Sequence, residues 1–197
     1  MNNKYRLIES EFIVNVFGAK LFRIQALKSF SIVSIGDKGG YVESEKNLDV
    51  SGNAWIFGNA QISGNAWISG NAQIFGNAWI SGDAQIFGNA QIFGNAWIFG
   101  NAWIFGNAQI SGDAQIFGDA QIFGDEIKKS GDWINIVGIN YNVTVTKTLC
   151  QIGCQGKPIR EWEKMTKKQA VELGLPAKEY AYFKQLLLLL FKRMEDI

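Results

Sequence analysis

Hydrophobic residues recur with a period of six through the middle of this chain. From Ser51 to Ile122 the sequence reads [Ser/Phe]-Gly-[Asn/Asp]-Ala-[Trp/Gln]-Ile twelve times without a break. Because side chains alternate between the two sides of a strand, Ala and Ile face one way, and Trp/Gln and Phe/Ser face the other. Gly and Asn tolerate the positive φ of a tight corner. The pattern therefore predicts short strands of Ala-[Trp/Gln]-Ile-[Phe/Ser] joined by Gly-[Asn/Asp] corners.

This period resembles the hexapeptide repeat of left-handed parallel β-helices, in which three hexapeptides form one triangular coil. The resemblance implies that Ile fills the inside of each face and that Ala fits near the corner. The twelve units then make about four coils, stacked at the strand spacing of roughly 4.8 Å. A degenerate unit at residues 45–50 precedes them, with Leu48 in the Ala column and Val50 in the Ile column. A thirteenth unit begins at Phe123 and fails at Glu126.

An eighteen-residue coil sorts the outward aromatic residues onto three faces. Stacked rings gain contact with one another, and stacked Gln side chains can hydrogen-bond. These ladders either only stabilise the stacking of the coils or form an interaction surface, since monomers seldom expose large apolar patches. The candidate surface residues are Trp55, Phe57, Phe75 and Phe93 on the first face, Trp79, Trp97, Phe99 and Phe117 on the second, and Trp67, Trp103, Phe87 and Phe105 on the third.

The ends of the chain differ from the repeat in charge and in pattern. Residues 51–124 carry only three charged side chains, all Asp, whereas the flanks are rich in Lys and Glu. We expect three parts: an N-terminal β cap (1–44), the hexapeptide-repeat β-helix (45–125) and a C-terminal α+β cap (126–197). Such caps are needed because the last coils of a solenoid present open strand edges.

Within the N-terminal cap, residues 12–17 and 20–27 predict a β-hairpin that turns at Gly18-Ala19. Residues 29–34 predict a further strand, and residues 36–40 a turn that leads into the repeat.

Within the C-terminal cap, three strands are predicted at residues 133–137, 141–146 and 149–154, followed by helices. Pro158 can open a helix over residues 159–165, and Thr166 with Gln169 has the form of a capping box for a second helix that ends at Gly174. Residues 177–194 predict a longer helix. Its Leu residues give it apolar surface nearly all round, so we expect the β-helix or another subunit to bury it.

The flanks contain KYRL at residues 4–7, LFRIQALKSF at 21–30, GGYVESEKNL at 39–48, IGC at 152–154 and IREW at 159–162. With SGNAWI at residues 51–56, these segments resemble a family of bacterial and phage hexapeptide-repeat proteins. Members are often labelled transferases, because the same β-helix occurs in acyltransferases. The resemblance implies the fold and a bacterial, phage or prophage origin, and a fold alone does not imply a function.

The residue types disfavour catalysis. The chain contains no His, whereas hexapeptide acyltransferases resemble one another in using a His base and the related carbonic anhydrases in holding zinc with His. Asp83, Asp113 and Asp119 stand in the corner column, where Asp and Asn are interchangeable. Cys150 and Cys154 supply two of the four ligands of a structural zinc, and we interpret them as half-buried thiols. We therefore expect no catalytic residue, no cofactor and no metal.

Charge and hydropathy limit the partners. The net charge is +1 and the aromatic faces lack Lys and Arg, so we expect neither nucleic acid nor an acidic membrane surface to bind. The longest apolar run, residues 186–191, is far short of the roughly 20 residues that span a bilayer. The first residues lack the apolar stretch of a signal peptide. These features predict a cytoplasmic protein.

The sequence thus predicts a non-catalytic structural or interaction protein. Its rigid ladders would dock onto copies of itself, as a homo-oligomer, or onto another protein, such as a host or defence protein if the origin is phage. Two alternatives stay open. One is a diverged acyltransferase-like protein, and the other is a carbohydrate-binding β-helix whose rings stack on sugars.

Overall fold

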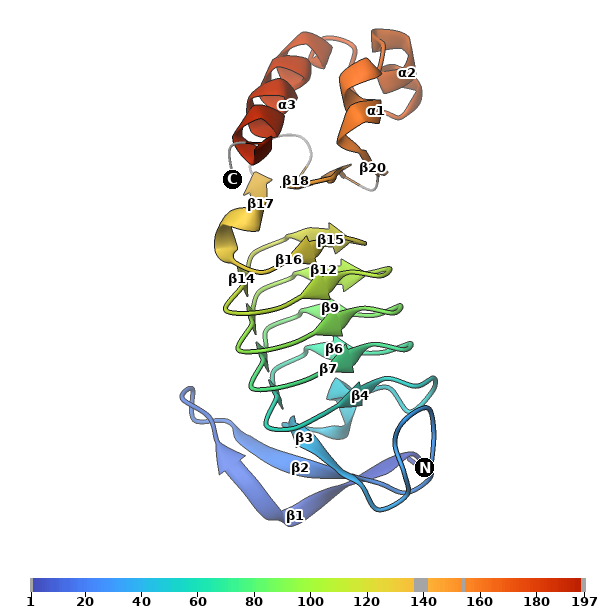
Figure 1. Ribbon diagram of the computed structural model, residues 1–197, viewed down its shortest axis with the longest axis vertical. Helices are drawn as coiled ribbons and strands as arrows, with labels where there is room; N and C mark the ends of the chain where they lie inside the picture. Colours follow the sequence, from blue (N-terminus) through green and yellow to red (C-terminus); the bar gives the residue numbers. More distant parts are fainter. Residues whose placement is uncertain (1, 137–141, 154, 196–197) are drawn as a thin grey trace. The chain divides into compact units, whose positions relative to one another are not determined.

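A computed structural model describes residues 2–136, 142–153 and 155–195 of the chain (Figure 1). The chain divides into two compact units, Met1–Ser130 and Gly131–Ile197. The first unit is almost wholly β, and the second combines a small antiparallel sheet with helices.

The repeat folds into a parallel β-solenoid of about five turns, so the predicted mainly β solenoid is confirmed. Its strands stack in three parallel ladders, which are the faces of the coils in Figure 1. The β4 face contains β4 (Trp55–Ile56), β7 (Gln73–Ile74), β10 (Gln91–Ile92), β13 (Gln109–Ile110) and β16 (Glu126–Ile127). The β5 face contains β5 (Gln61–Ile62), β8 (Trp79–Ile80), β11 (Trp97–Ile98) and β14 (Gln115–Ile116). The β6 face contains β6 (Trp67–Ile68), β9 (Gln85–Ile86), β12 (Trp103–Phe105) and β15 (Gln121–Phe123).

The interior of the solenoid consists of the Ala and Ile columns. Every Ala and Ile of the twelve units is at most 1% exposed. Burying each Ile side chain contributes on the order of 1.5–3 kcal/mol, and the small Ala leaves room for the chain to bend. The strands are shorter than the four residues expected, because the chain turns again within every six-residue unit.

Backbone hydrogen bonds connect each coil to the next. The amide of Trp79 donates to the carbonyl of Ala96 at 2.9 Å, and the amide of Ser81 donates to Ile98 at 2.9 Å. Strand partners within the repeat are one full coil apart in the sequence, as in the pair Ile80 and Ile98. Identical positions of successive coils therefore lie directly above one another.

The register changes where the repeat begins and ends. At the start of the repeat, Val42 pairs with Ile62 and Leu48 pairs with Ile68. These partners are further apart in the sequence than the partners within the regular coils. Leu48 is 1% exposed and Val50 is 41% exposed, so the placement of Val50 in the Ile column was wrong. The reason is a 3₁₀ turn, η1 (Glu45–Asn47), which replaces a regular corner. On the last side Ile127 pairs with Ile110, at a spacing narrower than one coil, and extends the solenoid by one strand.

Three strands precede the repeat: β1 (Tyr5–Val14), β2 (Lys20–Ala26) and β3 (Lys38–Val42). The predicted hairpin turn is confirmed between β1 and β2, although β1 begins well before the expected start at Phe12. The strand predicted at residues 29–34 was wrong. That segment makes an isolated bridge between Phe30 and Val33, and Ser31 between them has φ 48°. β3 pairs in parallel with β5, so the hairpin and the β5 face form one continuous sheet.

Polar side chains from the N-terminal part satisfy the carbonyl groups of the first coil. The buried ammonium of Lys4 donates to the carbonyls of Asp49 at 2.9 Å and Ala54 at 2.8 Å. The hydroxyl of Tyr5 lies 2.9 Å from the carbonyl oxygen of Leu48. The side-chain amide of Asn47 donates to Ala66 at 2.9 Å. These hydrogen bonds provide donors for backbone carbonyl groups at the edge of the first coil, which would otherwise be buried without a partner.

The second unit contains a four-stranded antiparallel sheet and helices. The sheet is formed by β17 (Trp133–Ile136), β18 (Val143–Thr146), β19 (Leu149–Ile152) and β20 (Gln155–Pro158), and a 3₁₀ turn, η2 (Ser130–Asp132), precedes β17. The helices are α1 (Ile159–Lys164), α2 (Lys167–Glu172) and α3 (Tyr180–Glu195). The predicted capping box is confirmed, since Thr166 and Gln169 cap α2 reciprocally. β20 was not predicted, and the expectations for residues 137, 141 and 154 lie outside the described part of the chain.

Only one side of α3 is buried. Phe183, Leu187, Phe191 and Met194 pack against Trp162 of α1 and against the sheet. On the opposite side, Leu188 is 47% and Leu189 is 68% exposed. Within its own unit the helix is therefore covered on one side only, and its burial by the β-helix or by another subunit stays a prediction.

Candidate interaction surface

The outward side chains of the solenoid form two columns on each face. One column holds the Trp and Gln residues and the other holds the Phe and Ser residues, as the alternation predicted. At the corners, Asn side chains also bond from coil to coil, and Asp takes the acceptor position at some rungs of these ladders. Asn65 donates to Asp83 at 2.9 Å, and Asn101 donates to Asp119 at 2.8 Å. Each of these Asp side chains acts as an acceptor in a corner ladder.

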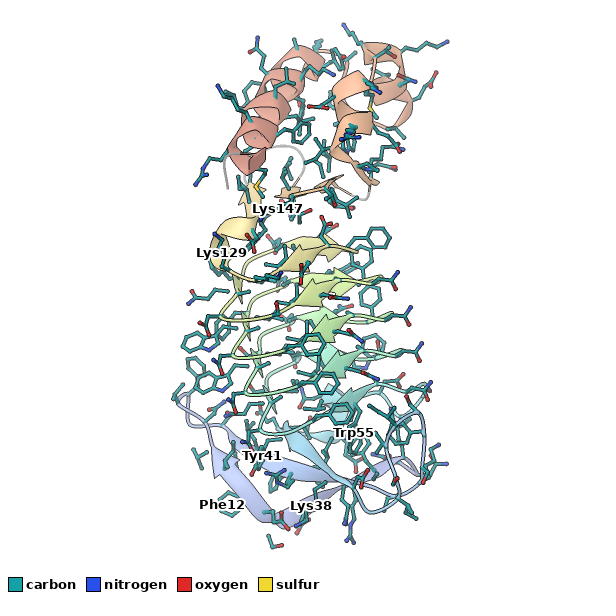
Figure 2. All side chains as sticks on the ribbon, viewed as in Figure 1. Phe12, Lys38, Tyr41, Trp55, Lys129 and Lys147 are labelled. Atoms are coloured by element: carbon teal, nitrogen blue, oxygen red, sulfur yellow. The ribbon has the colours of Figure 1, made fainter. Side chains whose placement is uncertain are left out.

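The β4 face corrects one member of the predicted surface. Trp55 is 1% exposed, because Tyr5 and Phe30 pack against its ring at 6.3 and 5.5 Å between centroids. Figure 2 shows Trp55 close to the N-terminal segments. Further along this face, Phe57, Phe75 and Phe93 form a continuous stack with centroids 4.4 and 5.2 Å apart. Trp55 therefore belongs to the core under the N-terminal strands and cannot contact a partner.

The β5 face carries a stacked Trp pair. The rings of Trp79 and Trp97 lie 5.3 Å apart and nearly parallel, at 6°. Phe99 meets Trp97 edge-on at 5.8 Å. Trp97 is 42% and Phe117 is 54% exposed. All eight outward side chains of this face are uncharged.

The β6 face is also aromatic. Phe87 stacks on Phe105 at 5.2 Å and touches Trp103 edge-on at 6.3 Å. Trp67 and Trp103 are 42% and 43% exposed. Of the twelve predicted surface residues, eleven therefore lie on the outside of the solenoid, in three separate ladders.

A further apolar element was missed by the sequence reasoning. The tip of the β1–β2 hairpin, residues 14–18, presents Val14, Val16 and Phe17 with exposed fractions of 61%, 72% and 70%. Asn15 and Phe17 of this hairpin tip line a small hollow together with Gln61, Ser63, Trp79 and Phe99 of the β5 face. In the hollow, the buried Oε1 of Gln61 finds no hydrogen-bond donor among the described residues. The run of apolar residues around Gly18 was the available signal.

The geometry of the rings bears on the carbohydrate alternative. A sugar stacks on the open face of an aromatic ring. In the parallel ladders the faces of the inner rings are covered by their neighbours, as in Phe57–Phe75–Phe93. These ladders present the edges of the rings to a partner, and this geometry favours apolar contact with a protein over stacking on a sugar.

The second unit contains a cleft of about 470 Å³ between α1 and α2. Three of its lining residues are basic, Lys157, Arg160 and Lys164, and two are acidic, Glu161 and Glu172. Lys157 and Glu161 lie 3.7 Å apart as an ion pair. The mixed charge gives the cleft no strong preference for an anion or a cation.

Cys150 is buried more deeply than expected. It is 0% exposed, and the carbonyl of the same residue accepts from the indole N–H of Trp162 at 2.8 Å. Burial raises the pKa of the thiol to about 12. A thiol of this kind is a core group rather than a nucleophile, and Cys154 lies outside the described residues.

These features define a repeat protein of the β-solenoid class whose faces carry exposed aromatic ladders. A family model described as YdcK Beta solenoid repeat matches residues 60–72. This match lies within the repeat and supports a β-solenoid repeat protein. No curated protein matches the chain. Within the described residues, no helix combines the length and the apolar character needed to cross a membrane.

Proposed function

We propose that this chain is a non-catalytic binding scaffold, in which the solenoid holds uncharged aromatic ladders at fixed spacing for a protein partner, first of all a copy of itself. The observation that carries the proposal is the exposure of Trp67, Trp97 and Trp103 at 42–43% on faces whose outward columns carry no charge. Exposed aromatic side chains on a surface without charged groups are typical of protein interaction surfaces. The lack of His and of loops inserted into the repeat supports a non-catalytic role.

A foreign protein is the second occupant that the same surface fits. The resemblance to bacterial and phage proteins makes a host or defence protein the natural choice for such a partner. In either case, binding uses the apolar edges of the ladders, because these faces offer Gln and Ser as hydrogen-bonding groups but no charged group.

The experiment is a triple substitution, Trp67→Gln, Trp97→Gln and Trp103→Gln. Gln already occupies this column in neighbouring coils, as at Gln85 and Gln115, so we expect the variant to keep its circular dichroism spectrum. Its mass in solution, measured by light scattering over a concentration series, should equal that of the monomer, whereas we expect the wild type to form oligomers. If instead the ladders only stabilise stacking, the variant loses thermal stability and its mass equals that of the wild type at every concentration.

A further inference from the structure

We propose that two copies of this chain dock through their β5 faces in antiparallel orientation. The twofold axis of the dimer lies in the plane of the interface, parallel to the strands of the β5 face, and passes between β8 and β11, so that it reverses the order of the coils in the second copy. The proposal rests on the proposed function and adds to it the face, the orientation and the register.

The Trp/Gln column of the β5 face reads the same in both directions. From the first coil to the last it consists of Gln61, Trp79, Trp97 and Gln115. Antiparallel docking centred between β8 and β11 reverses this order in the second copy. Trp79 then lies opposite Trp97 of the second copy, and Gln61 lies opposite Gln115. Apolar groups thereby meet apolar groups, and amides meet amides.

The unsatisfied acceptor of the first coil fits the same arrangement. Oε1 of Gln61 is buried without a donor among the described residues, in the hollow beside the hairpin tip. Antiparallel docking brings the carboxamide of Gln115 from the second copy to this hollow. A buried acceptor without a partner costs about 1–3 kcal/mol, so a rotation of the Gln61 side chain that lets the second copy satisfy Oε1 favours the dimer.

The Phe/Ser column is complementary to its own reverse. It consists of Ser63, Ser81, Phe99 and Phe117 in axial order. Antiparallel docking places Phe99 of the second copy opposite Ser81, and Phe117 opposite Ser63. Each large ring then faces a small side chain, which is the packing that interfaces require.

The hairpin tip contributes to the same contact. It stands beside the first coil of the β5 face, as the shared hollow shows. In the antiparallel dimer the last coil of the second copy lies next to it, so Phe17, at 70% exposed, faces Phe117, at 54% exposed. These two rings are among the most exposed aromatic side chains of the first unit.

A parallel dimer, with its twofold axis along the solenoid, fits less well. It would place Trp97 against Phe99 of the second copy and leave Trp79 against Ser81, so large groups crowd at one end and gaps remain at the other. Charge does not separate the two orientations. Parallel docking opposes Asp113 to Asp119, but it also brings Arg23, which contacts Asn59 at 3.5 Å, toward Glu43, which accepts from the amide of Gly64. The shape of the columns therefore selects the orientation.

The other two faces lack this self-complementarity. On the β4 face, Trp55 is buried and the rest of its column consists of three Gln residues followed by Glu126. On the β6 face, antiparallel docking would set Phe87 against Phe105 of the second copy, so two large rings would oppose each other. Within each chain these two rings are already stacked on one another.

The contact area indicates a weak dimer. Four rungs at roughly 4.8 Å, with strands of about 13 Å, cover on the order of 250 Å² on each copy. A stable interface buries about 800 Å² per partner, so the two hairpin tips must add to the area. An uncharged surface of this size suits a second copy, and we expect dissociation in the micromolar range.

The first experiment is sedimentation equilibrium of two matched variants. Trp97→Gln changes the β5 face, and Trp103→Gln makes the same change on the β6 face at a closely similar exposed fraction. We expect Trp97→Gln to raise the dissociation constant at least tenfold and Trp103→Gln to leave it within twofold. If only Trp103→Gln weakens association, the proposed scaffold function stands and the β5 dimer is overturned. If neither variant weakens it, both proposals fail. A wild type that stays monomeric at every concentration up to its solubility limit overturns the dimer.

The second experiment tests orientation by mixing singly substituted chains. Antiparallel docking places residue 77 opposite residue 95, whereas parallel docking places it opposite residue 83. We expect Asn77→Cys chains to cross-link with Asn95→Cys chains through a bismaleimide reagent of about 10 Å, the spacing of packed sheets. Mixtures of Asn77→Cys with Asp83→Cys, and wild-type chains with their native Cys residues, are the controls. Faster cross-linking of residue 77 to residue 83 would overturn the antiparallel arrangement.

Discussion

Substitution of two glycines of the repeat distinguishes the free-energy cost of backbone strain from the cost of crowding between coils. Gly94 and Gly118 occupy the same position of the repeat unit, at two different corners of the solenoid, and have nearly equal φ, 72° and 70°. A Cβ on Gly94 would lie 2.8 Å from the carbonyl oxygen and 3.0 Å from the nitrogen of Gly112 in the next coil. A Cβ on Gly118 would meet nothing within 4 Å. Gly94→Ala and Gly118→Ala therefore differ in the contact between coils and share the local conformation.

The magnitude follows from these contacts. An L-residue in the left-handed region costs about 1–2 kcal/mol, and replacing Gly removes about 0.4–1 kcal/mol of unfolded-chain entropy. The difference between these two figures is a small net loss of stability, which both variants share. Overpacking adds about 1–3 kcal/mol for Gly94→Ala alone, since the Gly112 carbonyl must move while it accepts from the amide of Asn95. We expect Gly94→Ala to be about 2 kcal/mol less stable than Gly118→Ala, or roughly 4–8 °C lower in Tm.

The assay is urea unfolding followed by Trp fluorescence and circular dichroism. Because the last coil could unfold separately, Ile116→Ala serves as a probe of cooperativity: it should lower the same transition as Ile80→Ala. With that condition met, equal midpoints for Gly94→Ala and Gly118→Ala would refute the claim that coil-to-coil contact requires Gly at the corners.

Three further predictions concern the core and the buried titratable groups. Ile98→Ala, in the centre of the solenoid, should lower the free energy of unfolding by about 2–5 kcal/mol, whereas Gln91→Ala, outside on the neighbouring face, should change it by less than about 0.5 kcal/mol in urea titrations. Desolvation lowers the pKa of Lys4 to about 8, and burial raises the pKa of Tyr5 above its ordinary value. Unfolding takes up a proton at Lys4 above pH 8, so stability should rise up to about pH 10 and then level off or fall as Tyr5 ionises in the unfolded chain; Lys4→Met should abolish the rise in thermal melts. Finally, Cys150, with its raised pKa and buried thiol, should resist iodoacetamide in the native protein and react on unfolding, as peptide mass spectrometry can show; rapid native labelling would contradict the burial.

The repeat allowed the solenoid to be predicted, because one short pattern determines both the inside and the outside of every coil. The Ala and Ile columns and the hairpin turn at Gly18 followed from alternation and turn chemistry, whereas the three faces followed from the resemblance to hexapeptide-repeat β-helices. The left-handed sense remains an expectation from the resemblance. The capping box at Thr166 was readable for the same reason, since its two partners are close together in the sequence.

What failed depended on contacts distant in sequence. Trp55 stands in the same position of its unit as Trp79, and nothing nearby distinguishes them; Tyr5 and Phe30 bury it from far along the chain. The segment Gln155–Pro158 is an exception, because its partner β19 directly precedes it in the sequence; it was missed because it lacks β-branched residues. The hairpin tip lies outside the repeat, so no column pattern connected it to the β5 face.

The spacing of strand partners changes only where the repeat joins its ends. It is wider than one coil between Val42 and Ile62, equals one coil within the repeat, and is narrower between Ile110 and Ile127. Between these two junctions, no feature of the described residues fixes the number of coils. A loss of residues 75–92 would join Ile74 to Phe93 on the same face and leave both junctions intact, whereas a loss of a single unit would rotate one end by a third of a turn. The number of coils can therefore change during evolution while the fold stays the same. Unequal exchange between near-identical stretches of the gene would add or remove whole coils.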